Sequence, residues 1–302
     1  MVSHRLKNIT SSEARDTKVN YKIIQGDCRE ALKQVDSDSV HTCVTSPPYF
    51  GLRDYGGGEG EIGSEQEVEE YVKAMVDVFR EVRRCLRPDG TLWLNLGDSY
   101  IAQYNVAPPP QTIGGQRGMP SDFIPGNRKK QKGLKHKDLI GIPWRVAFAL
   151  QADGWWLRQD IIWSKPNPMP ESVEDRCTKA HEYIFLLSKK SHYYYDHKAV
   201  KETSVSGEEK KNKRSVWTVN TKGYKGAHFA VYPKNLILPC ILAGCPEGGT
   251  VLDPFTGSGT TAIVALENNR NFVGTELNPE YIQLAENRIK EEIPTTLASL
   301  MH

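Results

Sequence analysis

Two short segments of the chain combine residue types that could hold a cofactor and a planar substrate. The first, VLDPFTGSGTT from Val251 to Thr261, is an apolar strand that leads through an Asp into a glycine-rich turn and a helix. Such a turn lets the backbone approach a nucleotide-like ligand. The second is Thr45-Ser-Pro-Pro-Tyr49, directly after the apolar residues 40–44. Proline fixes the backbone angle φ, so a Pro-Pro loop that ends in an aromatic residue is suited to holding a planar ring.

Two acidic residues accompany the glycine-rich turn. Asp253 ends the first strand, where its carboxylate could meet a cation such as the amino group of a methionyl moiety. Glu276 ends the next predicted strand, about 20 residues after Gly257, which is the spacing of the acid that binds ribose hydroxyls in Rossmann-like sites. The turn fits G-x-G-x-x-G poorly and no G-x-x-x-x-G-K-[ST] is present, so the pattern favours S-adenosylmethionine (AdoMet) over a dinucleotide or ATP. A plain tight turn, the alternative for the glycines alone, does not explain the two acids.

The elements expected around these segments alternate between strands and helices. Alternation of this kind predicts an α/β fold with a doubly wound, mostly parallel sheet. Asn278 is expected to cap the last helix and Pro279 to be its first residue, whereas Arg87-Pro-Asp-Gly90 is expected to form a turn. The predicted strands are 21–25, 40–44, 91–95, 155–164, 182–187, 251–253 and 271–276, and the predicted helices are a short one through Leu32, 65–86, 142–152, 233–243, 260–268 and 279–292.

Together the two segments resemble the AdoMet-binding and catalytic motifs of the amino-methylating DNA methyltransferases, which modify N4 of cytosine or N6 of adenine. The catalytic motif precedes the AdoMet motif, and the strand that leads to Asp27 lies at the N-terminus. This order resembles the circularly permuted class called beta. The resemblance implies a Rossmann-like AdoMet methyltransferase fold, circularly permuted, with a small DNA-recognition lobe.

The resemblance also implies which residues contact the cofactor. The segment Gly26-Asp27-Cys28 is similar to the one that touches the adenine ring, and residues 227–235 are similar to the one that flanks the methionine end. Asp27 could equally cap the helix that follows it. The implied cofactor-binding residues are Asp27, Cys28, Phe229, Asp253, Phe255, Thr256, Gly257, Ser258, Gly259, Thr260, Thr261, Glu276 and Asn278.

The Ser-Pro-Pro-Tyr loop suits methyl transfer to an exocyclic amino group, whose lone pair is delocalised into the base. Hydrogen-bond acceptors on its N–H groups localise the lone pair, and the Ser46 hydroxyl and the Pro47 carbonyl could supply them. Tyr49 could stack on a target base that has been flipped out of the duplex. The implied catalytic residues are Ser46, Pro47, Pro48 and Tyr49.

The residue at position 46 bears on the choice of base. In the family, Ser at this position is more typical of cytosine-N4 enzymes and Asp of adenine-N6 enzymes, so Ser46 favours N4 and leaves N6 open. A C5-cytosine mechanism needs a cysteine nucleophile, and Cys240, in the only Pro-Cys pair, lies in an apolar helical stretch where a buried structural role is expected.

Two basic stretches, 128–137 and 210–225, are the candidate DNA contacts, because clustered Lys and Arg bind phosphates. Trp217 interleaves with the second stretch, and 197–226 is the candidate target-recognition region. The expected organisation is a flexible N-terminus (1–20), two catalytic parts (21–99 and 141–196) with a basic insertion between them (100–140), and an AdoMet-binding part after the recognition region (227–302). The implied DNA-binding residues are Arg128, Lys129, Lys130, Lys132, Lys210, Lys211, Lys213 and Arg214.

Composition limits the class of protein and its setting. The chain has 302 residues, a formal net charge of +2, six scattered cysteines without a CxxC, no signal-peptide core and no apolar run of about 20 residues. We therefore expect no metal site, no disulfide framework, no membrane span and a reducing bacterial cytoplasm. The expected partner is duplex DNA, in a restriction-modification or phage-modification setting that could include a cognate endonuclease, and the protein could be a monomer or a homodimer. RNA or protein N-methylation and a non-catalytic DNA-binding regulator remain as alternatives.

Overall fold

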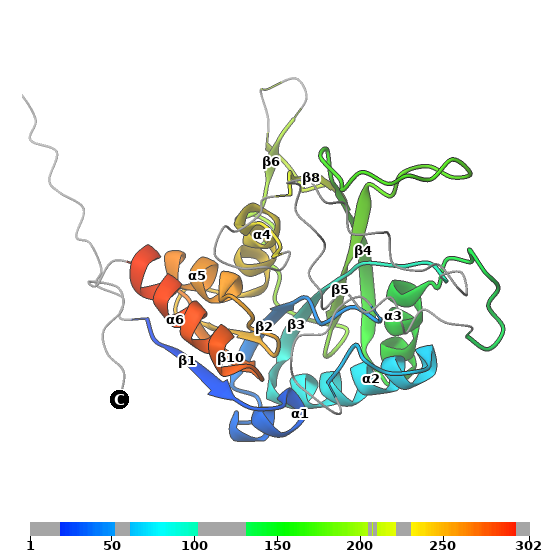
Figure 1. Cartoon of the computed structure of the whole chain (residues 1–302). Helices are drawn as coiled ribbons and strands as arrows, with labels where there is room; N and C mark the ends of the chain where they lie inside the picture. The colour runs from blue at the N-terminus through cyan, green and yellow to red at the C-terminus, as the bar shows by residue number, and fades with distance from the viewer. Residues whose placement is uncertain are drawn as a thin grey trace, which may run out of the picture.

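The structure is a computed structural model, and it describes residues 19–51, 61–101, 131–204, 207, 210–221 and 231–293. This part of the chain forms an eight-stranded sheet with the order β1-β10-β9-β2-β3-β5-β4-β8 (Figure 1). Its strands are β1 (Tyr21–Gln25), β2 (Val40–Thr45), β3 (Leu86–Leu96), β4 (Trp156–Ser164), β5 (His181–Ser188), β8 (Val216–Thr218), β9 (Thr250–Asp253) and β10 (Asn271–Glu276).

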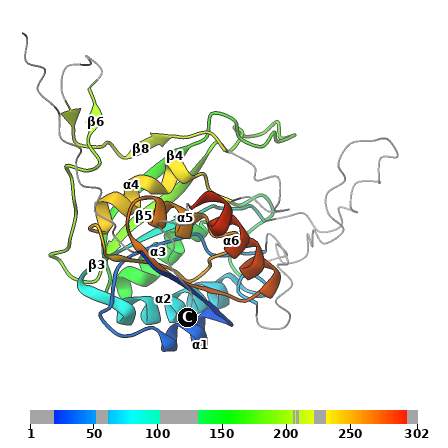
Figure 2. The same ribbon diagram turned by 90° about the vertical axis from the view of Figure 1, so that its left-hand side faces the viewer.

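Helices cover both faces of the sheet, so the fold has three layers (Figures 1 and 2). One core cluster, with Tyr71 and Val146 among its members, lies under α1, α2 and α3, and a second, with Ile241, Ile263 and Ile289, lies under α4, α5 and α6. The helices are α1 (Cys28–Ala31, followed by a 3-10 turn, Leu32–Gln34), α2 (Val68–Cys85), α3 (Ile142–Ala152), α4 (Lys234–Gly244), α5 (Thr260–Glu267) and α6 (Pro279–Glu292).

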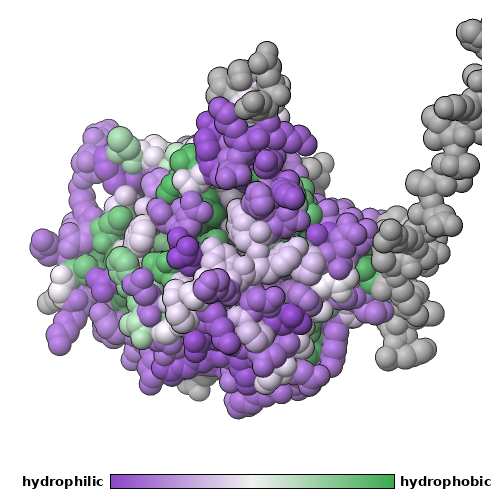
Figure 3. All heavy atoms as spheres, turned by 180° about the vertical axis from the view of Figure 1, so that it is seen from behind, coloured by the Kyte–Doolittle hydropathy of each residue, from purple (hydrophilic) through white to green (hydrophobic). Residues whose placement is uncertain are grey.

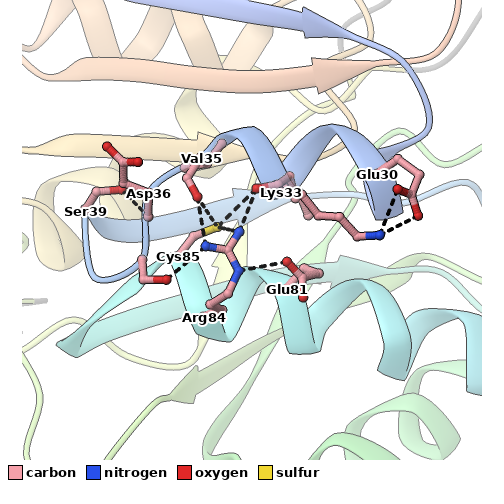
Figure 4. A network of polar contacts seen from close by, with 10 residues as sticks. Glu30, Lys33, Val35, Asp36, Ser39, Glu81, Arg84 and Cys85 are labelled. Atoms are coloured by element: carbon pink, nitrogen blue, oxygen red, sulfur yellow. Dashed lines mark hydrogen bonds and ion pairs between the residues drawn. The ribbon is translucent and has the colours of Figure 1, made fainter.

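The longest of these helices, α2, illustrates how the sequence forms the layers. Its buried residues recur at helical spacing and include Tyr71, Met75, Val78 and Val82, which is the apolar stripe of an amphipathic helix. At its C-terminal end, Arg84 donates hydrogen bonds to the carbonyls of Leu32 and Val35 at 2.7 and 2.9 Å (Figure 4). These bonds join both ends of the 3-10 turn to α2.

The topology confirms the prediction of a mostly parallel, doubly wound sheet. The strands β1, β10, β9, β2 and β3 are parallel neighbours, whereas β5 is antiparallel to both β3 and β4. The N-terminal strand β1 lies beside β10, and β2 lies beside β9. The two ends of the chain therefore complete one sheet, as the permuted motif order requires.

The predicted turn at Arg87–Gly90 is wrong as stated. Strand β3 begins directly after α2, with Leu86 opposite Val40 of β2, and regular pairing resumes with Thr91 opposite Thr42. The intervening residues are an irregularity within the strand, because Pro and Gly interrupt the pairing without reversing the chain.

The region 197–226 adds small strands to this framework. Strand β8 pairs with β4 and forms the edge of the main sheet, and β6 (Glu202–Thr203) pairs with β7 (Lys210–Lys211) as a separate two-stranded sheet.

The surface of the molecule seen from behind is largely hydrophilic (Figure 3). No helix in the described part of the chain has the length and apolar character needed to cross a membrane.

Candidate active site at the strand ends

The two segments singled out in the sequence meet at one edge of the sheet. Strands β2 and β9 are parallel neighbours, with Cys43 opposite Leu252, so the Ser-Pro-Pro-Tyr loop and the glycine-rich turn both leave from the same edge. The Thr45 hydroxyl donates a hydrogen bond of 2.6 Å to Oδ1 of Asp253 and joins the two strand ends directly. This is the position at which open α/β sheets bind their ligands.

Asp253 is almost fully buried, with 1% of its surface exposed. Its Oδ1 also accepts from the Phe255 N–H at 3.0 Å, and its Oδ2 accepts from the Thr261 and Tyr232 hydroxyls at 2.5 and 3.3 Å. Burial raises the pKa of the Asp253 carboxyl, although these hydrogen bonds lower it. The carboxylate therefore organises the turn from inside the protein, a structural role that the sequence pattern did not reveal.

The glycine-rich turn leaves room for a ligand at Gly257. This residue has a φ of +50°, and an added Cβ would have only the Phe255 carbonyl nearby, at 3.9 Å. Its N–H donates to Oε2 of Glu276 at 2.8 Å, and the Asn278 N–H donates to Oε1 at 2.9 Å. Glu276 is thus fixed beside the open backbone, at the end of β10. Burial raises the pKa of its carboxyl.

The polar side chains of the turn are buried, namely those of Thr256, Ser258, Thr260 and Thr261. Thr256 is buried and donates to the backbone carbonyl of Asp253 at 3.2 Å. Gly259 caps α5 with a φ of +79°, and a Cβ there would lie 2.9 Å from Cβ of Ala285 in α6. Only glycine therefore allows α5 and α6 to approach this closely.

Arg288 of α6 is a contributor that sequence reasoning missed. It is 5% exposed, and its Nη1 donates to the Ser258 carbonyl at 2.7 Å, to the Ser258 hydroxyl at 2.9 Å and to the Thr260 hydroxyl at 3.2 Å. It thereby holds the turn from behind. No local pattern signals this role, because the hydrogen bonds join residues 28 to 30 positions apart.

Asp27 and Asn278 both act as helix caps. The Asp27 carboxylate accepts from the Arg29 N–H at 2.9 Å and forms an ion pair with the Arg29 side chain, which lowers the pKa of the carboxyl. Asn278 accepts from the Glu280 N–H at 2.9 Å. The Gly26 N–H donates to the Glu276 carbonyl at 2.9 Å, so Asp27 lies at the same sheet edge as the turn.

The Cys28 side chain is buried in the core, and burial raises the pKa of its thiol to about 12. A cofactor at this edge would therefore meet the backbone of Cys28 and not its sulfur. Cys240 is 1% exposed with a pKa raised by burial, so the predicted structural role is confirmed. Among the residues that the structure describes, no cluster of His, Cys, Asp and Glu could hold a metal ion.

Contacts within the Ser-Pro-Pro-Tyr loop and with its neighbours hold it in place. Tyr71 of α2 donates to the Pro48 carbonyl at 2.9 Å, and the Ser46 hydroxyl donates to the Tyr49 hydroxyl oxygen over 3.4 Å. The Tyr49 hydroxyl in turn donates to Oε2 of Glu182 at 2.8 Å. The ring of Tyr49 lies against Gly97, where an added Cβ would come within 2.6 Å of the ring carbon Cε2.

A small hollow lies beside this loop. It is lined by Tyr49, Phe50, Gly97, Asp98, Ser99 and Ile142. Asp98 itself accepts from the N–H groups of Gly141 and Ile142 at 3.0 and 3.1 Å, so it caps α3. These contacts satisfy N–H groups in the first turn of α3, which have no partner within the helix.

The basic residues lie on the surface. Lys132, Lys210, Lys211 and Arg214 are exposed, and Arg214 forms an ion pair with Glu202. Lys213 lies over the ring of Trp217, with its Nζ 4.9 Å from the ring centroid. Trp217 itself is 6% exposed and packs in the core, so its ring supports this region from inside. Predicted residues Arg128, Lys129, Lys130 and Phe229 lie outside the described part of the chain.

Comparisons with known proteins agree with this geometry. The DNA methylase family model for N6 and N4 enzymes matches residues 40–287. A type II methyltransferase of Serratia marcescens, M.SmaI, is 54% identical over 275 residues, which cover 89% of this chain and 90% of that protein. M.Cfr9I, a type II methyltransferase of Citrobacter freundii, is 50% identical over 270 residues, covering 89% of this chain and 88% of that protein.

Solved structures share the fold. The PvuII DNA methyltransferase (cytosine-N4-specific) superposes with a TM-score of 0.67 at 21% identity, covering 92% of this chain and 89% of that one. A putative DNA modification methylase of Thermus thermophilus, complexed with S-adenosyl-L-methionine, gives a TM-score of 0.63 at 25% identity, with 94% of this chain and 100% of that one covered. The chain therefore belongs to the N6/N4 DNA methylase family and is an AdoMet-dependent DNA methyltransferase.

Proposed function

We propose that the protein methylates the exocyclic N4 of cytosine in duplex DNA, as the modification enzyme of a restriction-modification system. The observation that carries the base choice is Ser46, a neutral hydroxyl beside Tyr49 at the end of β2 and next to the glycine-rich turn. The type II methyltransferases that are about half identical to this chain support the biological setting.

The residues at the sheet edge fit AdoMet. The open backbone at Gly257 allows close approach of a ligand, Glu276 is fixed beside it for ribose hydroxyls, and Phe255 lies partly buried in the same turn. When bound, AdoMet supplies an electrophilic methyl group with a good leaving group. The enzyme's own contribution is to position the acceptor amino group and to localise its lone pair.

We assign the two acceptors for the target amino group to the Ser46 hydroxyl and the Pro47 carbonyl. The neighbouring Pro48 carbonyl accepts from the Tyr71 hydroxyl, so we assign it to holding the loop in place. The ring of Tyr49, held against Gly97, provides the stacking surface for the flipped base. The amino nitrogen would form the new N–C bond as the S–C bond to the methyl group breaks, S-adenosylhomocysteine would leave as the neutral thioether, and the proton that the nitrogen then loses would pass to solvent.

DNA binding beyond the target base is assigned to exposed cations. We propose that Lys132 and its neighbours contact phosphates and that the region 197–226, which carries Lys210, Lys211, Lys213 and Arg214, reads the sequence. The small sheet β6–β7 would present part of this region.

Nucleoside mass spectrometry tests the proposal. Purified protein is incubated with AdoMet and a DNA library, and the DNA is digested to nucleosides; N4-methylcytosine is the expected product. A Ser46→Ala variant, purified in the same way and shown by calorimetry to bind AdoMet as tightly as the wild type, is the control for contaminating activity. N6-methyladenine as the sole product would overturn the base choice, and the absence of any methylated base would overturn the proposed function as a whole.

A further inference from the structure

Glu182 is an acidic residue next to the catalytic loop that the proposed mechanism has not used. It lies near the start of β5, opposite Trp163 of β4. Because β5 runs antiparallel to β3, the start of β5 lies at the edge where β2 and β3 end, beside Tyr49 and Asn95. Its side chain is 15% exposed, and a carboxylate with so little access to water is retained only where partners satisfy it.

The partners of Glu182 form a chain of polar contacts. Oε2 accepts from the Tyr49 hydroxyl at 2.8 Å and from Nδ2 of Asn95 at 3.2 Å. Oε1 accepts from Nζ of Lys165, and this Nζ lies 4.2 Å from the centroid of the Trp163 ring. The lysine side chain is 17% exposed. The carboxylate is thus paired with a cation that an aromatic ring holds from its other side.

This pairing fixes the direction of the hydrogen bonds that lead to Ser46. A hydroxyl has one proton to donate and lone pairs to accept with. A hydrogen bond to a carboxylate is stronger than one to a neutral oxygen, so the Tyr49 proton points to Glu182 and not to Oδ1 of Asn95, which is 3.4 Å away. The Tyr49 oxygen then faces Ser46 with a lone pair, and the Ser46 proton turns toward it over 3.4 Å.

We infer that Glu182 is a positioning residue that makes Ser46 a hydrogen-bond acceptor, an inference that rests on the proposed function. With its proton directed to Tyr49, Ser46 presents lone pairs to the N–H of the target amino group. Without Glu182, the Tyr49 proton is free to point to Ser46, whose own proton then turns toward the substrate and opposes the incoming N–H. Lys165 maintains the arrangement by holding the Glu182 carboxylate in place.

The test combines Glu182→Gln with Tyr49→Phe, which keeps the stacking ring and removes only the hydroxyl. We expect Glu182→Gln to lower the single-turnover methylation rate by about 10²-fold, the scale of a misplaced reacting group, with unchanged affinity for AdoMet by calorimetry and for duplex by fluorescence anisotropy. If both residues act through one chain, the double variant loses no more than the larger single loss. Glu81→Gln is the matched control, because Glu81 is also ion-paired, with Arg84, but lies by the opposite edge of the sheet, near residues 35–39 (Figure 4).

Each outcome decides the inference. An unchanged rate in Glu182→Gln, losses that multiply in the double variant, or a loss confined to duplex affinity would overturn it. If Glu182→Gln fails to fold, Lys165→Met is used instead, and its rate loss should likewise vanish in the Tyr49→Phe background. Wild-type protein that methylates no base refutes the proposed function, whereas an active wild type with an unaffected Glu182→Gln variant refutes only the role of Glu182.

Discussion

Replacing Gly259 with alanine should destabilise the protein through one identifiable contact. A left-handed conformation costs a residue with a Cβ about 1–2 kcal/mol, and Gly259 has a φ of +79°. The new Cβ would also lie 2.9 Å from Cβ of Ala285 and 3.2 Å from its Cα, and overpacking of this kind costs about 1–3 kcal/mol. We therefore expect Gly259→Ala to lower the free energy of unfolding by about 2–5 kcal/mol.

Gly257→Ala is the matched control for this prediction. Its φ of +50° carries a similar conformational cost, but its Cβ would enter open space, so the free energy of unfolding should fall by only about 1–2 kcal/mol. Urea unfolding without AdoMet separates the two, since bound ligand would raise the apparent stability. Calorimetry should give the reverse order for AdoMet affinity, with Gly257→Ala the weaker binder. Equal stability losses in the two variants would refute the close approach of α5 and α6.

Three further predictions concern charge and chemistry. Ser46→Ala should reduce turnover by about 10²–10³-fold, as when one transition-state hydrogen bond is removed, with unchanged AdoMet affinity; an unaffected single-turnover rate would place the acceptor elsewhere. Burial raises the pKa of the Asp253 carboxyl above its ordinary 3.8, so the folded state binds a proton there more tightly than the unfolded chain does. Relative to Asp253→Asn, the free energy of unfolding of the wild type in urea should therefore fall as pH rises from 3.8 through the raised pKa, and a rise would contradict this environment. Neutralising the lysines of 128–137 should flatten the dependence of log affinity on log salt by up to ~0.9 for each phosphate that is no longer bound, whereas substitutions in 210–225 should change which sequence is methylated; an unchanged salt slope would reject phosphate binding by 128–137.

Local patterns in the sequence were sufficient for most of the elements and for the location of the site. The helix 142–152, the strand 271–276 and the Asn278 cap all appear with the predicted bounds, because each depends on periodicity and on end signals within a few residues. The two motifs follow strands whose order in the sheet brings them to one edge. Their meeting was predictable since parallel neighbours end at the same side.

The tertiary structure alone decided which partners surround each of these residues. The sequence pattern suggests that Asp253 binds the cofactor. In the fold, hydrogen-bond donors from the turn and from strand β2 surround its carboxylate. Trp217 looks like a surface aromatic, but the pairing of β8 with β4 buries it. Glu182 gave no signal at all, because its hydrogen bond with Tyr49 spans 133 residues. Periodicity and turn chemistry act over a few residues, whereas burial and long-range hydrogen bonds exist only once the sheet has assembled.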